Sequence, residues 1–224
     1  MKTRSPTAAA RLRKAARGAA QLALTLPTWG GARKGAGRKP KGAKAGMPHL
    51  RRPALAARFP VHVTVRVRPH VWNLRSRRSF AVIGKALWAM AERFGMRLCE
   101  FSVQGNHVHL VVEAADRVAL ARGMKGLGVR LARGLNRLMG RAGAVLADRY
   151  HAHILRTPSE VRHAVPCVRE NQRKHAALRG AVLPARYVDP YSSLGREHGI
   201  VLPRPRTWLL GQTIAKQHGE AAHA

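Results

Sequence analysis

The stretch RLCEFSVQGNHVHLVVEA, from Arg97 to Ala114, decides the fold of this chain. Its first half alternates apolar and polar residues, which is the pattern of a β-strand. Gly105 and Asn106 give a strong two-residue turn signal, and the apolar run after them indicates a return strand. The stretch therefore predicts a β-hairpin. Because successive side chains of a strand point to opposite faces, His107 and His109 are expected on one face of the sheet.

Further elements are predicted on the N-terminal side of this hairpin. VHVTVRV (residues 61–67) alternates in the same way and indicates a strand. After it, apolar residues from Phe80 to Phe94 recur at helical spacing, and Gly95 suits the end of a helix. These patterns predict a strand followed by a helix that continues to Gly95.

Two elements follow the hairpin and complete the pattern. Asp116 is placed to cap a long helix that ends near Met139, and RYHAHILRT (149–157) indicates a last strand. The order is then β-α-β-β-α-β. This order predicts an α+β fold of the ferredoxin-like split βαβ type, in which helices cover one face of an antiparallel sheet.

A last helix is predicted directly after this strand. Thr157, Pro158 and Glu160 make the signature of a capping box with proline in the first turn. The helix is expected to run through Asn171 towards His175. It forms an addition to the ferredoxin-like pattern.

The charge of the chain points to a polyanionic partner. Its 224 residues contain 42 Lys and Arg against 10 Asp and Glu, which gives a formal net charge of +32. Nucleic acid is the usual partner of such a chain. Aromatic residues are only 5% of the composition, which does not favour binding through many stacked bases. The two cysteines give neither a disulfide framework nor a zinc spacing. No apolar run is long enough to cross a membrane, so a cytoplasmic protein is expected.

The distribution of charge divides the chain into three parts. Residues 1–58 contain no acidic residue and are rich in Ala, Gly, Arg and Lys, so a mostly disordered basic tail is expected. The folded domain is expected over residues 59–178, and a C-terminal extension interrupted by prolines over 179–224. A homodimer is compatible with the sequence, which does not decide the oligomeric state.

Two groups of cations are candidate DNA contacts. GRKPKG in the tail resembles an AT-hook, a peptide that enters the minor groove of A·T-rich DNA, although a flexible tail that grips phosphates explains it more simply. The cations of this motif are Arg38, Lys39 and Lys41. A second group lies mostly on one side of the long helix: Arg122, Lys125, Arg130, Arg133 and Arg137.

The paired histidines indicate a cation site. Burial of two neighbouring imidazoles without partners costs several kcal/mol, whereas a metal ion between them supplies a partner. Neutral imidazoles are common metal ligands. His107 and His109 are not a complete site, so a third ligand must come from another part of the chain.

The segment SVQGNHVHLVVE resembles the signature of the HUH single-tyrosine transposases, and among them the REP-associated tyrosine transposases, which are IS200-like. HUH stands for His, a bulky apolar residue and His, here His107, Val108 and His109. Other stretches that read like this family extend over residues 60–177. The resemblance implies a bacterial, nucleoid-associated protein that nicks and rejoins single-stranded hairpin DNA. It also implies Mg²⁺ or Mn²⁺ as cofactor, held by the two histidines and by Asn171.

The resemblance fails at the nucleophile. The family has a tyrosine four residues before the polar ligand, where it forms a phosphotyrosine intermediate, but this chain has Cys167 there. Pro166 precedes it, and a proline inside a helix costs about 3 kcal/mol. The other tyrosines are Tyr150, in the last strand, and Tyr187 and Tyr191, in the extension.

Three classes of function follow from these observations. The first is a transposase with impaired catalysis. The second is a repurposed DNA-binding protein that does not cleave. The third is an RNA-binding protein, because ferredoxin-like sheets with basic faces also bind RNA, although the aromatic-rich sheet motif of RNA-recognition modules is absent.

Overall fold

The computed structural model describes residues 52–195 and 198–221. An antiparallel five-stranded sheet with strand order β2-β3-β4-β1-β5 is at its centre. This order confirms the predicted ferredoxin-like arrangement, with the short β2 added at one edge. The strands are β1 (Val61–Arg66), β2 (Glu92–Arg93), β3 (Met96–Val103), β4 (His107–Ala114) and β5 (His151–Ile154).

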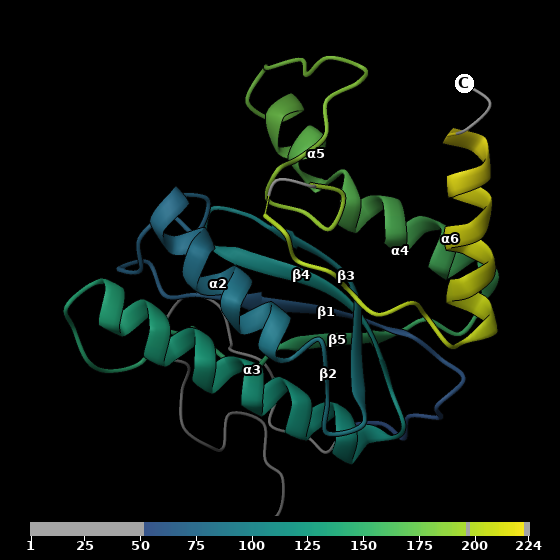
Figure 1. Ribbon diagram of the computed structural model, residues 1–224, viewed down its shortest axis with the longest axis horizontal. Helices are drawn as coiled ribbons and strands as arrows, with labels where there is room; N and C mark the ends of the chain where they lie inside the picture. The colour runs from purple at the N-terminus through teal and green to yellow at the C-terminus, as the bar shows by residue number, and fades with distance from the viewer. Residues whose placement is uncertain (1–51, 196–197, 222–224) are drawn as a thin grey trace, which may run out of the picture. The chain divides into compact units, whose positions relative to one another are not determined.

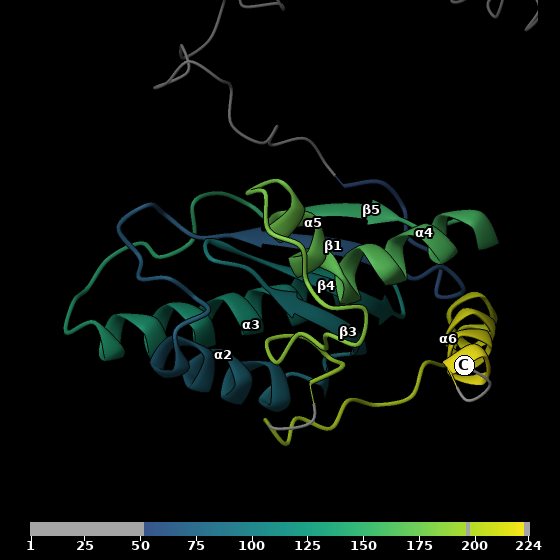
Figure 2. The ribbon, with the colours of Figure 1, turned by 90° about the horizontal axis from the view of Figure 1, so that it is seen from above.

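Helices cover both faces of the sheet, as Figures 1 and 2 show. The pair expected from the split βαβ pattern packs on one face, and the later helices lie on the other. The first pair is α2 (Arg77–Ala89) and α3 (Arg117–Leu138). The later ones are α4 (Pro158–Arg169) and α5 (Asn171–Ala177), with α6 (Trp208–Ala221) packed against α4. None of the described helices has both the length and the apolarity that a bilayer crossing requires.

The two faces have separate hydrophobic cores. Alternate residues of β1 and β4, among them Val63 and Leu110, join α2 and α3 in the larger cluster. Val111 of β4 points the other way and packs with α4 and α6 in the smaller cluster, which includes Val165 and Leu210. Because both faces are covered, almost every residue of β3 and β4 is at least half-buried.

The predicted helix starts are confirmed. The Asp116 carboxylate accepts hydrogen bonds from the backbone N–H groups of Val118 and Ala119, each at 2.7 Å, and so caps α3. Thr157 and Glu160 form the reciprocal capping box at the start of α4. These bonds satisfy backbone donors that have no partner inside the helix.

The predicted end of the first helix is wrong. α2 ends at Ala89, and the chain then forms β2, which pairs with the start of β3. Phe94 and Gly95 connect the two with φ values of 57° and 72°. Positive φ at both positions is the pattern of a type I′ hairpin turn, so Gly95 serves the turn and does not end a helix. Phe94 accordingly lies 56% exposed and outside the predicted apolar helix face.

The predicted last helix is interrupted. It runs through Pro166, but it breaks at Glu170, whose backbone angles are −103° and 16°, and α5 starts at Asn171. The Glu170 N–H still donates to the Pro166 carbonyl at 2.8 Å. The helix axis is therefore interrupted one turn after the proline, between the family's nucleophile position and its ligand position.

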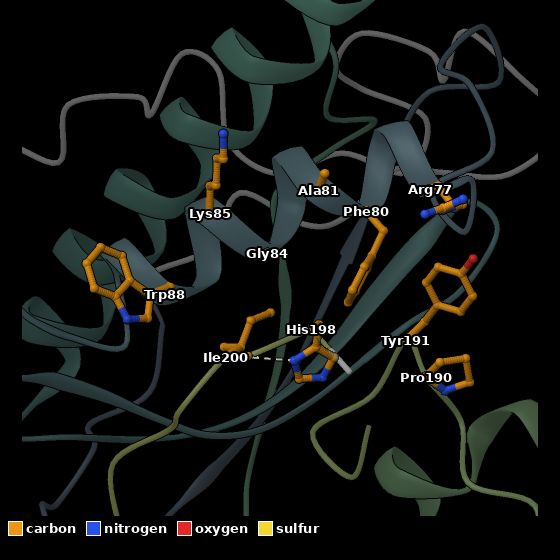
Figure 3. Close-up of a pocket in the computed structure, with 11 residues that line it drawn as sticks. Arg77, Phe80, Ala81, Gly84, Lys85, Trp88, Pro190, Tyr191, His198 and Ile200 are labelled. Carbon is orange, nitrogen blue, oxygen red and sulfur yellow. Dashed lines mark hydrogen bonds between the residues drawn. The ribbon is translucent and has the colours of Figure 1, made fainter. Parts of the chain in front are cut away.

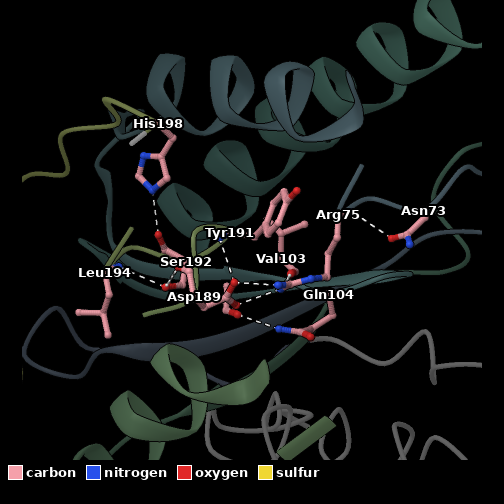
Figure 4. Close-up of polar contacts among 10 residues, drawn as sticks. Asn73, Arg75, Val103, Gln104, Asp189, Tyr191, Ser192, Leu194 and His198 are labelled. Atoms are coloured by element: carbon pink, nitrogen blue, oxygen red, sulfur yellow. Dashed lines mark hydrogen bonds and ion pairs between the residues drawn. The ribbon is translucent and has the colours of Figure 1, made fainter. Parts of the chain in front are cut away.

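A segment of the C-terminal extension covers the outer edge of β3. We call residues Asp189–Ser193 the strap. Val103 donates its N–H to the Tyr191 carbonyl at 2.8 Å, and the Ser193 N–H donates to Phe101 at 2.9 Å. Figure 4 shows the ion pair that holds the strap, in which Arg75 meets the buried Asp189 carboxylate with two bonds of 2.8 and 2.9 Å.

Close packing of α3 on the sheet makes a first prediction. A Cβ added at Gly123 would lie 2.5 Å from Met96 Sδ and 2.7 Å from Met96 Cβ. We expect Gly123→Ala to lower the free energy of unfolding by about 1–3 kcal/mol, because overpacking outweighs the gain in helix propensity. Gly211→Ala in α6, where nothing lies within 4 Å, is the matched control and should be neutral or stabilising. Equal effects of the two changes in urea denaturation would contradict this account of the packing.

Candidate functional site

The two histidines of β4 lie together on the face covered by α4 and α5. The ring centroids of His107 and His109 are 4.7 Å apart, and the rings are nearly perpendicular. Both side chains are half-buried, because the pleat of β4 turns them away from the larger core. The prediction that the hairpin presents both imidazoles on one face is confirmed.

Hydrogen bonds orient both rings. Nδ1 of His107 lies 2.7 Å from the Asn106 side-chain oxygen, so it donates, and Nε2 keeps its lone pair. Nδ1 of His109 lies 3.1 Å from Nε2 of His62 and 3.2 Å from the Thr64 hydroxyl, both on β1. Either partner can accept a proton from His109, which would again leave Nε2 free. Such an outer hydrogen bond is typical of histidines that bind metal ions.

Burial keeps both histidines neutral at physiological pH. It lowers the pKa of His107 to about 4, with smaller effects from His175 and Arg66. Burial also lowers the pKa of His109 to about 3, and the neighbouring His107 adds to this effect. Two neutral imidazoles side by side are the form that binds a cation.

Helix α5 lies beside this pair. The ring of His175 is 5.6 Å from that of His107, and the positive charge of Lys174 helps to lower the pKa of His109. Asn171, one turn earlier, is only 8% exposed, and its Nδ2 atom has no hydrogen-bond partner among the described residues. Only the amide oxygen of Asn171 could act as a ligand for a cation, because its Nδ2 is a hydrogen-bond donor. The break at Glu170 is what separates this turn from α4.

The donor set is rich in nitrogen. Within residues 52–195 and 198–221, no three His, Cys, Asp or Glu side chains lie close enough to hold a metal ion together. An ion bound by the two histidines would therefore take further ligands from the Asn171 amide or from water. Both supply oxygen, which Mg²⁺ and Mn²⁺ prefer. The residues present thus fit a weak site for such an ion.

Cys167 occupies the position where the resemblance implies a tyrosine. Its side chain is half-buried on α4, and Lys174 of α5 donates a hydrogen bond to its sulfur at 2.8 Å. Two of the three alternative tyrosines pack elsewhere. Tyr150 and Tyr191 both contact the larger core, on the face opposite the histidines. The buried phenol of Tyr150 has no hydrogen-bond partner in the described part of the chain, and Arg52 stacks over its ring at 3.7 Å.

The five predicted cations of α3 line one groove between α2 and α3, on the opposite face of the sheet. This α2–α3 groove has a volume of about 1110 Å³ and an apolar floor that includes Met90 and Val129. Two further cations, Lys85 and Arg93, also line it, and among the described lining residues there is no acidic one. The cations from the long helix are Arg122, Lys125, Arg130, Arg133 and Arg137. The cations predicted in the tail, Arg38, Lys39 and Lys41, lie outside the described residues.

A solved structure of another protein has a similar fold. A solved structure of a REP-associated tyrosine transposase bound to a REP hairpin superposes with a TM-score of 0.50 and 16% identity, over 72% of this chain and 91% of that one. At this identity the likeness shows the fold alone.

Other comparisons are weaker. A Deinococcus radiodurans R1 protein that has been assigned as a transposase matches with a TM-score of 0.38 and 14% identity, over 62% of this chain and 99% of that one. A bacterial tRNA(His) guanylyltransferase-like protein in complex with GTP matches with a TM-score of 0.35 and 10% identity, over 56% and 70%. No protein-family model and no curated protein matches the sequence.

Sequence reasoning missed several residues of the histidine face. His62 and Thr64 alternate with valines in β1, and their pairing with β4 places Thr64 directly opposite His109. The alternation of VHVTVRV predicts that His62 and Thr64 share a face of β1. It does not show which residues of β4 lie beside them. His175 carried no signal, because the break in the helix decides where its side chain lies.

The depressed pKa values predict a loss of stability in mild acid. Between pH 6.5, the ordinary histidine value, and about 4, the unfolded chain binds more protons at His107 and His109 than the folded chain does. Stability should therefore fall as the pH falls through this window. We expect urea denaturation in EDTA to give a lower free energy of unfolding at pH 5.0 than at pH 7.5.

Two variants test the origin of this effect. A His107→Gln/His109→Gln double variant should lose less stability between these pH values than the unmodified protein. The exposed His163 of α4 provides the matched control, and His163→Gln should leave the pH dependence as it was. An unchanged loss in the double variant would show that other groups cause the acid sensitivity.

Proposed function

We propose that this chain is a DNA-binding protein of the single-tyrosine HUH transposase type, and that it binds single-stranded DNA with hairpins while its cleavage is impaired. The observation that carries the proposal is the arrangement of two neutral histidines beside α5, in a chain with the fold of a REP-associated tyrosine transposase. That neighbour is bound to a REP hairpin, which supports a hairpin as the partner. Residues 59–178 would form the DNA-processing domain.

The histidines would hold the metal ion through the nitrogen that points away from their orienting bonds. His107 and His109 would each supply Nε2, and the buried Asn171 would supply its amide oxygen. A bound Mg²⁺ or Mn²⁺ would polarise the scissile phosphate of the DNA strand. Because these hard ions prefer oxygen, two nitrogen ligands imply modest affinity.

The missing phenol explains why cleavage should fail. Attack on phosphorus needs a nucleophile at about 3–3.5 Å, in line with the leaving oxygen. A cysteine side chain is much shorter than a tyrosine, and the Cys167 sulfur is already bonded to Lys174. Tyr150 and Tyr191 belong to the opposite face of the sheet. Binding of the metal and the strand should therefore survive without the chemistry.

The cations would supply most of the binding energy. Those of the α2–α3 groove lie where a phosphate backbone can be neutralised without competition from acidic side chains among its described lining residues. The basic tail over 1–58 would add contacts that do not depend on the folded domain. On single strands, each neutralised phosphate should contribute about 0.7 to the salt dependence of binding on a log–log scale.

Metal binding can be measured directly. Calorimetry with Mn²⁺ should show a weak binding heat for the unmodified protein and none for His107→Ala/His109→Ala. Asn171→Ala alone should bind Mn²⁺ more weakly than the unmodified protein, because it removes the oxygen ligand. His163→Ala, on the exposed side of α4, is the control and should bind as before. The same heat in the histidine double variant would refute the site.

Binding and cleavage can be measured separately with a labelled single-stranded hairpin DNA and Mn²⁺, and we expect binding without cleavage. The unmodified chain should retard the DNA but form no covalent adduct that survives denaturation. The double change Pro166→Arg with Cys167→Tyr should produce an adduct more readily than Cys167→Tyr alone, because it also restores the backbone donor inside α4. An adduct of the unmodified chain, mapped to Cys167, Tyr150, Tyr187 or Tyr191, would show that the enzyme has kept or replaced its nucleophile.

A further inference from the structure

A second groove lies between α2 and the C-terminal segment, beside the strap. Figure 3 shows it, and its volume is about 580 Å³, within the range of about 300–1,000 Å³ that is usual for small-molecule sites. We call it the α2–strap groove. Its main lining residues are Arg77, Phe80, Lys85, Trp88, Tyr191 and His198.

Aromatic rings form much of this groove. The Phe80 ring meets Tyr191 edge-on at 4.9 Å and lies 5.6 Å from His198. Trp88, one turn further along α2 from Gly84, is 66% exposed, although contact of its large apolar ring with water is unfavourable. The groove therefore offers a large aromatic surface that the described part of the chain leaves uncovered.

The charged residues of the groove indicate which kind of ligand it binds. Arg77 and Lys85 line it, and none of the described residues that line it is acidic. The chain's own tail has no Asp or Glu before Glu92, and a second copy of the chain carries the same net charge of +32. Both would be repelled from these cations. A flat, aromatic and anionic ligand satisfies both the rings and the charges, and a nucleotide has this chemistry.

The wall of the groove is held in place before anything binds. Arg75 donates to Asp189 and to the Val103 carbonyl, and its guanidinium stacks on the Tyr191 ring at 4.5 Å. The Tyr191 N–H in turn donates to Asp189 at 3.0 Å, as in Figure 4. A buried ion pair therefore fixes the ring that faces α2. Preorganisation of this kind lowers the entropic cost of binding.

We propose that the α2–strap groove binds nucleotides of single-stranded DNA, with a base against Trp88 and phosphates of the strand on Arg77 and Lys85. A base is free to stack in this way only where the strand is unpaired. Lys85 lines both this groove and the α2–α3 groove, so a strand can pass from one to the other. The site lies on the α2 side of the sheet and uses neither histidine of β4. Only the choice of DNA rests on the proposed function.

The test compares two oligonucleotides that differ only in their bases. The full-length protein is titrated with a fluorescent oligothymidylate of about ten nucleotides, the size of site that one small domain covers, and with an abasic strand of the same length and charge. The unmodified protein should bind oligothymidylate more tightly. Trp88→Ala should weaken this binding at least about fivefold and leave the abasic strand unaffected, because loss of a stacked base costs that much or more.

Three further variants make the outcome decisive. Trp72→Ala removes another exposed tryptophan, 47% accessible and outside the groove, and should keep the preference for bases. Trp88→Phe retains a ring and should recover part of the preference. His107→Ala/His109→Ala should keep all of it, which separates this inference from the proposed metal-dependent function. The inference is overturned if the unmodified protein binds both strands equally, or if Trp88→Ala keeps the preference.

Discussion

The rest of the structure depends on one constraint. Side chains along β4 alternate between two faces of the sheet, and both faces are covered. Leu110 and Val112 point to the core under α2 and α3, while His107, His109 and Val111 point to the face of α4 and α5. A slip of one residue in the pairing with β1 would reverse every side chain. The register therefore determines at once where the core lies and where the histidines are presented.

Three of the few carboxylates of this chain are buried and hold parts of the fold together. Glu100 pairs with the buried Arg169 of α4, and Glu113 accepts from the Thr207 backbone at the start of α6. Asp189 holds the strap to Arg75. In the described part of the chain, no ion pair involves the cations of α3 that line the α2–α3 groove. The surplus of positive charge thus stays at the surface, where it attracts polyanions.

The sequence was a good guide wherever a short-range rule applies. The hairpin, the caps at Asp116 and Thr157 and the order of elements follow from turn, capping and periodicity patterns, each of which acts within a few residues. It failed where two local rules compete. The apolar spacing up to Phe94 also fits a helix, but the pairing of Glu92 and Arg93 with β3 decides the turn at Phe94 and Gly95. That pairing involves a second strand, which helical periodicity does not include.

By itself the sequence determined the ferredoxin-like order, the shared face of His107 and His109, the excess of positive charge and the absence of a tyrosine at position 167. Only the tertiary structure decided that His62 and Thr64 orient His109, and that the break at Glu170 brings His175 beside His107. It alone joined Tyr191 to Phe80, more than a hundred residues apart, in an aromatic groove. The physical reason is that these neighbours come from sheet pairing and from the packing of the strap, which depend on distant segments at the same time, whereas periodicity and capping depend on adjacent residues.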